Sequence, residues 1–174
     1  MIRRLRLALL VALAVLLQVA LFPHLRLAGA VPDVGLVLVG VVAALEGPET
    51  GAILGFFTGL CVDLFLETPL GLSALAFALT GAAIGVAQAG LLRPGRWLGP
   101  LLGALAGALG NLLFVGVGIL IGQDQLRSAH AMQMVGLAVL YDAILGPFLF
   151  PLATWATRES PTSVSGVTRS GWSA

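Results

Sequence analysis

Three polar side chains lie inside otherwise apolar stretches of this sequence, and they are the first candidates for chemistry. Asp63, Asn111 and Asp142 each stand among Leu, Val, Ala, Phe and Gly. A carboxylate in an apolar interior is costly, so it must find a partner or serve as a proton or substrate site. Asn111 and Asp142 fall at similar depths in their segments, and we expect a hydrogen bond between them. For Asp142, a structural hydrogen bond is the favoured role and a proton or substrate site is the alternative.

No arrangement of nucleophile and base predicts an enzyme. Ser73 stands in a Gly-Leu-Ser-Ala sequence that faintly resembles an intramembrane serine protease motif, but alanine replaces the glycine expected after the serine. His24 and His130 fall near helix ends, whereas a Ser/His pair needs hydrogen-bond contact in a water-filled cleft. The single Cys61 excludes an internal disulfide. No cysteine and histidine spacing suggests a metal site, and no cofactor is expected.

Composition predicts a membrane protein. Hydrophobic residues make up 59% of the chain and charged residues only 10%, with a mean hydropathy of +1.04, against about 25% charged residues in soluble domains. A net charge of +1 gives no field for nucleic acid, which excludes that class of partner. Several spans of about 20 residues use up the 174-residue length, so we expect a single membrane domain over residues 1–157.

The apolar segments predict an all-α integral membrane protein, a compact bundle of six transmembrane helices. The second segment is short for a span, so a half-membrane hairpin with the third helix is the alternative. Residues 158–174 are rich in Ser, Thr and Gly and predict a disordered cytoplasmic tail. The expected helices cover residues about 5–22, 31–46, 50–66, 72–92, 98–121 and 130–157.

Glycines recur every fourth residue in the third and fifth expected helices. Positions four apart stack on one helix face, so each series forms a stripe without side chains. In lipid, such a stripe lets another backbone approach closely, either from the protein's own bundle or from a partner. Asp63 extends the first stripe, where it caps the packing seam or contacts a partner just outside the membrane. The candidate packing or docking residues are Gly51, Gly55, Gly59 and Asp63 in one helix and Gly99, Gly103 and Gly107 in the other.

Proline and glycine mark the expected turns and helix starts. Pro32 suits the first position of the second helix, where its missing N–H is no loss, and Asp33 in that first turn complements the helix dipole. Pro147 lies inside the sixth helix and frees a backbone carbonyl one turn back, beside Asp142. The remaining turn residues are Pro48, which opens the third helix, and Pro69 and Gly71, which force a reversal before the fourth.

Arginines set the expected orientation. Six helices place both termini on one side, and if that side is cytoplasmic the basic residues follow the positive-inside rule. A secretory signal peptide is the alternative for the N-terminal segment, but its uncharged run at 7–22 is longer than a usual signal core. We therefore expect the first helix to be retained. The inner basic residues are Arg3, Arg4, Arg6, Arg93, Arg96, Arg158 and Arg169, and the outer ones are Arg26 and Arg127.

The order and spacing of these residues resemble the rod shape-determining protein MreD family. Pro-Asp at 32–33 opens a short second helix, and Gly-x-x-x-Gly-Phe-x-x-Gly-x-x-x-Asp follows at 51–63. Pro-Leu-Gly-Leu-x-Ala-Leu at 69–75 then leads into the fourth helix. The similarity is clearest over residues 32–85, and the last two helices match mainly in layout and in Pro147.

The resemblance implies a non-enzymatic, multi-pass component of the bacterial inner membrane that belongs to the cell-elongation machinery. Its expected partner is MreC, a single-span protein with a periplasmic domain. The resemblance also implies association with MreB filaments and with the glycosyltransferase and transpeptidase that build peptidoglycan. It further implies a six-helix fold shared with the substrate-binding subunits of energy-coupling-factor transporters. Two positions depart from the family pattern: Ser73 replaces a larger polar residue, and Asp142 replaces an amide.

Two functions remain open from the sequence. The first is an adaptor, or scaffold, whose Gly-rich helix surfaces hold a partner's transmembrane helix within the membrane lipid. The alternative is a small-molecule or lipid-binding transporter subunit, in which Asp142, Asn111 and Thr80 line a pocket. The sparse polar inventory argues against a polar vitamin as ligand, because such a site needs several convergent donors and acceptors.

Overall fold

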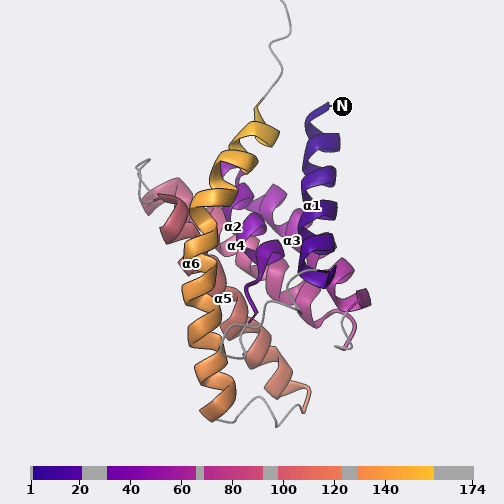
Figure 1. Ribbon diagram of the computed structural model, residues 1–174, viewed down its shortest axis with the longest axis vertical. Coiled ribbons are helices and arrows are strands. Elements are labelled where there is room, and N and C mark those ends of the chain that lie inside the picture. Colours follow the sequence, from indigo (N-terminus) through magenta and orange to yellow (C-terminus); the bar gives the residue numbers. More distant parts are fainter. Residues whose placement is uncertain (1, 21–30, 66–68, 92–97, 123–128, 159–174) are drawn as a thin grey trace, which may run out of the picture.

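Six α-helices pack into one bundle in a computed structural model, which describes residues 2–20, 31–65, 69–91, 98–122 and 129–158 (Figure 1). The expected tail lies outside the described residues except for Arg158. Every helix bound falls within three residues of the expected one. The helices are α1 (Ile2–Ala20), α2 (Val34–Glu46), α3 (Pro48–Phe65), α4 (Leu72–Leu91), α5 (Leu98–Leu120) and α6 (Ala129–Thr157).

Helix α2 is the core of the bundle. Every residue from Val34 to Ala44 is buried, and α2 contacts each of the other five helices. A helix that is apolar on all sides is typical of a protein core or of a membrane span. The interior position is compatible with the short length of α2, whose 13 residues rise about 20 Å, against a hydrocarbon core of about 30 Å.

Asp33 is the N-cap of α2 and does not lie in its first turn. Its side chain accepts a hydrogen bond from the Leu36 N–H at 2.9 Å, which satisfies one of the free amides of a helix start. Pro32 therefore precedes the cap, and its expected place at the first helical position is wrong. The Asp33 N–H donates to Oδ1 of Asp142 at 2.8 Å, which ties the start of α2 to the middle of α6.

Helix α1 is an integral part of the bundle. One of its faces is buried in the core through Leu7, Leu10, Ala14 and Val15. Near its C-terminal end, the Oε1 atom of Gln18 accepts a hydrogen bond from the N–H of the first α2 residue at 2.8 Å. Helix α1 therefore covers part of the apolar side of α2.

The remaining helices form two hairpins, α3 with α4 and α5 with α6. Gly47, with φ of 94°, ends α2 directly before Pro48 opens α3. Gly71, with φ of 97°, precedes α4. Both glycines have the left-handed backbone that other residues rarely adopt. Helix α6 runs without interruption through Pro147, although proline removes a hydrogen bond within a helix.

Three of the described helices are long and apolar enough to cross a membrane. The qualifying segments are Pro48–Phe65, Pro100–Leu120 and Gln133–Thr157, and the shorter apolar segments are Leu5–Ala20, Val34–Glu46 and Leu72–Gln88.

The start of α1 and the end of α6 lie at the same end of the molecule (Figure 1). At this end of the bundle, two arginines of α1 contact α2 and α6. A nitrogen of Arg3 lies 3.2 Å from a carboxylate oxygen of Glu46, at the C-terminal end of α2. The guanidinium of Arg6 lies 4.9 Å from the ring centroid of Trp155 in α6, within cation–π range.

Candidate functional site

The glycine stripe of α3 faces α4. Gly51, Gly55 and Gly59 are all buried. A Cβ atom on Gly55 would collide with the carbonyl oxygen of Phe77, and one on Gly59 would collide with that of Ser73. The two backbones are therefore in direct contact, so neither a partner helix nor α5 can reach this stripe while α4 is in place.

The glycine stripe of α5 faces α6 in the same way. A Cβ atom on Gly103 would collide with the carbonyl oxygen of Asp142, and one on Gly107 would lie 2.5 Å from its Oδ2 atom. Gly99 also lies in α5, but its surroundings lie outside what the structure describes. Both hairpins thus use their glycines for internal packing.

Asp63 caps α4 from the end of α3. Its carboxylate accepts hydrogen bonds from the N–H groups of Gly71 at 2.9 Å, Ser73 at 3.1 Å and Ala74 at 3.2 Å. A carboxylate at a helix N-terminus gains from these charge-assisted bonds and from the helix dipole. Asp63 is buried, which favours the capping role over contact with an external partner.

Asp142 and Asn111 do not form the expected hydrogen bond. The Nδ2 group of Asn111 donates instead to the carbonyl oxygen of Gly107, in its own helix, at 2.8 Å. Asp142 accepts from the Asp33 N–H, and its Oδ2 atom is buried without a hydrogen-bond partner. The sequence does not identify this contact, because hydropathy does not show which backbone N–H will lie near a carboxyl group.

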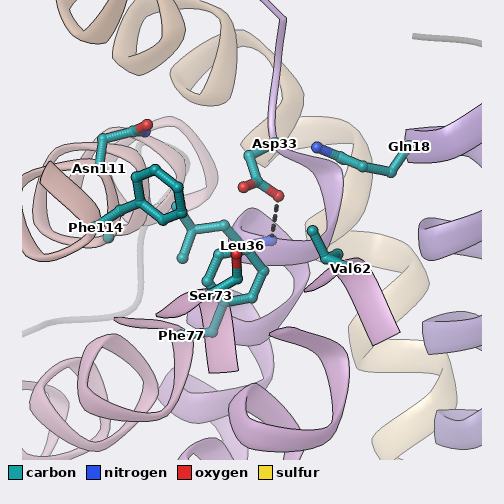
Figure 2. Close-up of a pocket in the computed structure, with 9 residues that line it drawn as sticks. Gln18, Asp33, Leu36, Val62, Ser73, Phe77, Asn111 and Phe114 are labelled. Carbon is teal, nitrogen blue, oxygen red and sulfur yellow. Dashed lines mark hydrogen bonds between the residues drawn. The ribbon is translucent and has the colours of Figure 1, made fainter. Parts of the chain in front are cut away.

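A small polar cavity lies at the start of α2, and we call it the α2 cavity (Figure 2). Its volume is about 150 Å³. Of the three residues expected to line a pocket, Asn111 lines the α2 cavity. Asp142 is fully buried and is not part of the lining, and the Thr80 hydroxyl donates to a carbonyl oxygen of its own helix. The lining consists of polar Gln18, Asp33, Ser73 and Asn111 with apolar Leu36, Val62, Phe77, Gly110 and Phe114.

Ser73, the candidate nucleophile, lies in the first turn of α4, where its N–H is bound to Asp63. His24 falls outside the described residues. His130 lies in α6, but its side chain is not among those the structure describes.

A longer, mainly apolar groove runs between α1 and α3, and we call it the α1–α3 groove. Its volume is about 1010 Å³. The lining extends from Arg3 to Val19 on α1 and from Glu49 to Phe65 on α3. The glycine stripe lies on the face of α3 that is opposite to the groove. The glycine pattern of the sequence therefore does not identify the α1–α3 groove.

Comparison with known proteins identifies the family. A match to MreD, described as rod shape-determining protein MreD, covers residues 1–155. Comparisons with curated proteins and with solved structures gave no match. The expected likeness to the substrate-binding subunits of energy-coupling-factor transporters therefore stays a prediction. The family match confirms the resemblance carried by the proline, glycine and aspartate spacing, and the chain belongs to the MreD family of membrane-bound, rod shape-determining proteins.

Proposed function

We propose that this protein is a non-catalytic adaptor of the cell-elongation machinery in the bacterial inner membrane. In this proposal it holds the transmembrane helix of an MreC-like single-span protein in the α1–α3 groove. It thereby helps to organise peptidoglycan synthesis by the elongation glycosyltransferase and transpeptidase, together with MreB filaments. Family membership supports the role in rod shape. The α1–α3 groove is the observation that supports docking of the partner's transmembrane helix.

The length of the groove fits a helix. The lining covers 16 residue steps on each of its two walls, which corresponds to about 24 Å at 1.5 Å per residue. This is most of the hydrocarbon core of about 30 Å. Small side chains, including Ala8, Ala12 and Thr50, form part of the lining and would let a partner backbone approach closely.

The charge at one end of the groove also fits a single-span partner. Glu49 lines this end, beside the ion pair of Arg3 with Glu46. In the orientation that we propose, this is the cytoplasmic end. Membrane helices carry an excess of Lys and Arg in their short cytoplasmic flanks. A basic flank just before a partner helix would therefore meet the Glu49 carboxylate.

A substitution that places a large side chain in the α1–α3 groove tests this proposal. Ala12 is exposed in the groove on α1, and Ala83 is exposed on α4, away from it. We expect Ala12→Phe to reduce co-purification of a co-expressed MreC-like partner about tenfold or more, which corresponds to a loss of at least about 1.4 kcal/mol. Ala83→Phe should leave co-purification unchanged. If both variants retain the partner equally, the groove is not its docking surface.

A further inference from the structure

Polar residues from several helices line the α2 cavity. One carboxylate oxygen of Asp33 accepts the capping bond, and the other turns toward the side of Asn111 and Phe114 (Figure 2). The Gln18 carbonyl accepts from α2, and its amide nitrogen faces Asp33 (Figure 2). Ser73 is bound through its backbone N–H, and its side chain lines the cavity. Polar groups from α1, α2 and α4 therefore converge on one space.

Two carboxyl groups lie at or next to the α2 cavity. Asp33 and Asp142 lie side by side, joined by the Asp33 N–H. The arginine side chains that the structure describes are those of Arg3, Arg6 and Arg158. Arg3 contacts Glu46 at the C-terminal end of α2, Arg6 contacts Trp155 near the end of α6, and Arg158 follows α6. The α2 cavity lies at the other end of α2, at its start. Two carboxyl groups next to a cavity without a described basic neighbour favour a positively charged occupant, since an opposite charge stabilises a buried carboxylate.

The aromatic lining and the volume of the α2 cavity indicate which class of ligand it can bind. Phe77 and Phe114 both line the cavity, and aromatic rings attract organic cations through their negative faces. A cavity of about 150 Å³ accommodates a molecule of roughly the size of benzene. From these observations we propose that the α2 cavity binds a small organic ammonium ion, whose charge pairs with Asp33 and whose alkyl part packs against the two phenyl rings. This site is separate from the α1–α3 groove.

Two probes of equal shape test the proposal on the full chain in detergent. tert-Butylammonium and tert-butanol have the same number of non-hydrogen atoms but differ in charge. Titration calorimetry, with sodium chloride at the same ionic strength as the reference, should detect binding of tert-butylammonium and at least about tenfold weaker binding of tert-butanol, a difference of about 1.4 kcal/mol. Equal binding of the two probes, or binding of neither, would overturn the proposal.

Variants locate the site within the protein. Asn caps helices as well as Asp does, so Asp33→Asn keeps the start of α2 and removes only the charge. We expect it to weaken tert-butylammonium binding about tenfold or more, and Phe114→Leu to weaken it several-fold through loss of the ring. Arg158→Gln, at the end of the bundle away from the α2 cavity, should leave the affinity unchanged. Unchanged affinity in Asp33→Asn, with the protein folded by its thermal transition, would contradict the assignment.

The same ammonium chemistry occurs in free amines and in the ethanolamine headgroup of a lipid. Maltoside micelles with and without short-chain phosphatidylethanolamine distinguish the two sources. If the headgroup occupies the cavity, tert-butylammonium should bind more weakly when the lipid is present, because the lipid competes for Asp33. If a free amine is the ligand, the lipid should leave the affinity unchanged. Absence of tert-butylammonium binding in both conditions would contradict an ammonium site.

Discussion

At the residue scale, the carboxyl groups of half-buried Asp33 and of buried Asp63 and Asp142 all accept hydrogen bonds from backbone N–H groups. Asp63 takes three at the start of α4, Asp33 takes one at the start of α2, and Asp142 takes that of Asp33. An amide left unsatisfied in an apolar interior costs about 1–3 kcal/mol. These carboxyl groups therefore help to fix where α2 and α4 begin.

Two substitutions of Asp142 test the hydrogen bond that its side chain accepts from the Asp33 N–H. Asp142→Asn can keep the acceptor for the Asp33 N–H, so we expect the free energy of unfolding to stay within about 1 kcal/mol of the parent. Asp142→Leu offers no acceptor and should lower the free energy of unfolding by about 1–3 kcal/mol, because the Asp33 N–H is left unsatisfied. Thermal unfolding in detergent measures both. Equal stability of the two variants would show that this hydrogen bond contributes little.

Asp63 offers a second test at this scale. We expect Asp63→Ala to lower the free energy of unfolding by about 1–3 kcal/mol, because buried N–H groups at the start of α4 lose their acceptor. Glu49→Ala removes an exposed carboxylate from the same helix and should change stability by less than about 0.5 kcal/mol. Denaturant titration of the two variants side by side gives the comparison. A loss in Glu49→Ala as large as that in Asp63→Ala would argue against capping.

At the scale of elements, both hairpins are closed by glycines that bring two backbones into contact. The stripe of α3 meets α4, and that of α5 meets α6. The sequence predicts such close approach from the spacing alone, but the spacing does not say which backbone comes close. It also leaves the partner of Asp142 undetermined, because Asp33 lies 109 positions away in the chain. Helix positions, in contrast, follow from uninterrupted apolar stretches between Gly and Pro turns.

The stability of alanine variants distinguishes glycines that pack against another helix from glycines that have open space around them. A Cβ atom on Gly59 would meet the α4 backbone, whereas one on Gly116 would have no atom within 4 Å. We expect Gly59→Ala to lower the free energy of unfolding by about 1–3 kcal/mol through overpacking. Gly116→Ala should raise it by up to about 1 kcal/mol through helix propensity. Thermal unfolding checks both, and a stable Gly59→Ala variant would contradict the close α3–α4 contact.

At the scale of the whole molecule, the short α2 is enclosed by five helices, and the chain leaves the α1–α3 groove open along one side. The start of α1 and the end of α6 share one end (Figure 1). From the excess of arginine at that side of the predicted topology, we propose that this end faces the cytoplasm.

A reporter tests the orientation. Gly122 follows the end of α5, at the end of the bundle opposite the start of α1 (Figure 1). A phosphatase that is active only outside the cytoplasm, fused after Gly122, should therefore be active, and the same enzyme fused after Arg158 should be inactive. The reverse pattern would overturn the orientation and, with it, the proposed pairing of Glu49 with a cytoplasmic basic flank.

Site-specific photo-crosslinking in living cells tests the docking of a partner helix most directly. Leu16 lines the α1–α3 groove and is 62% exposed, and Ile144 on α6 is 56% exposed outside it. With a photoreactive amino acid at each position in turn, we predict a crosslink from position 16 to the transmembrane helix of the MreC-like partner and none from position 144. Crosslinking to that helix from position 144 but not from position 16 would contradict the proposed function.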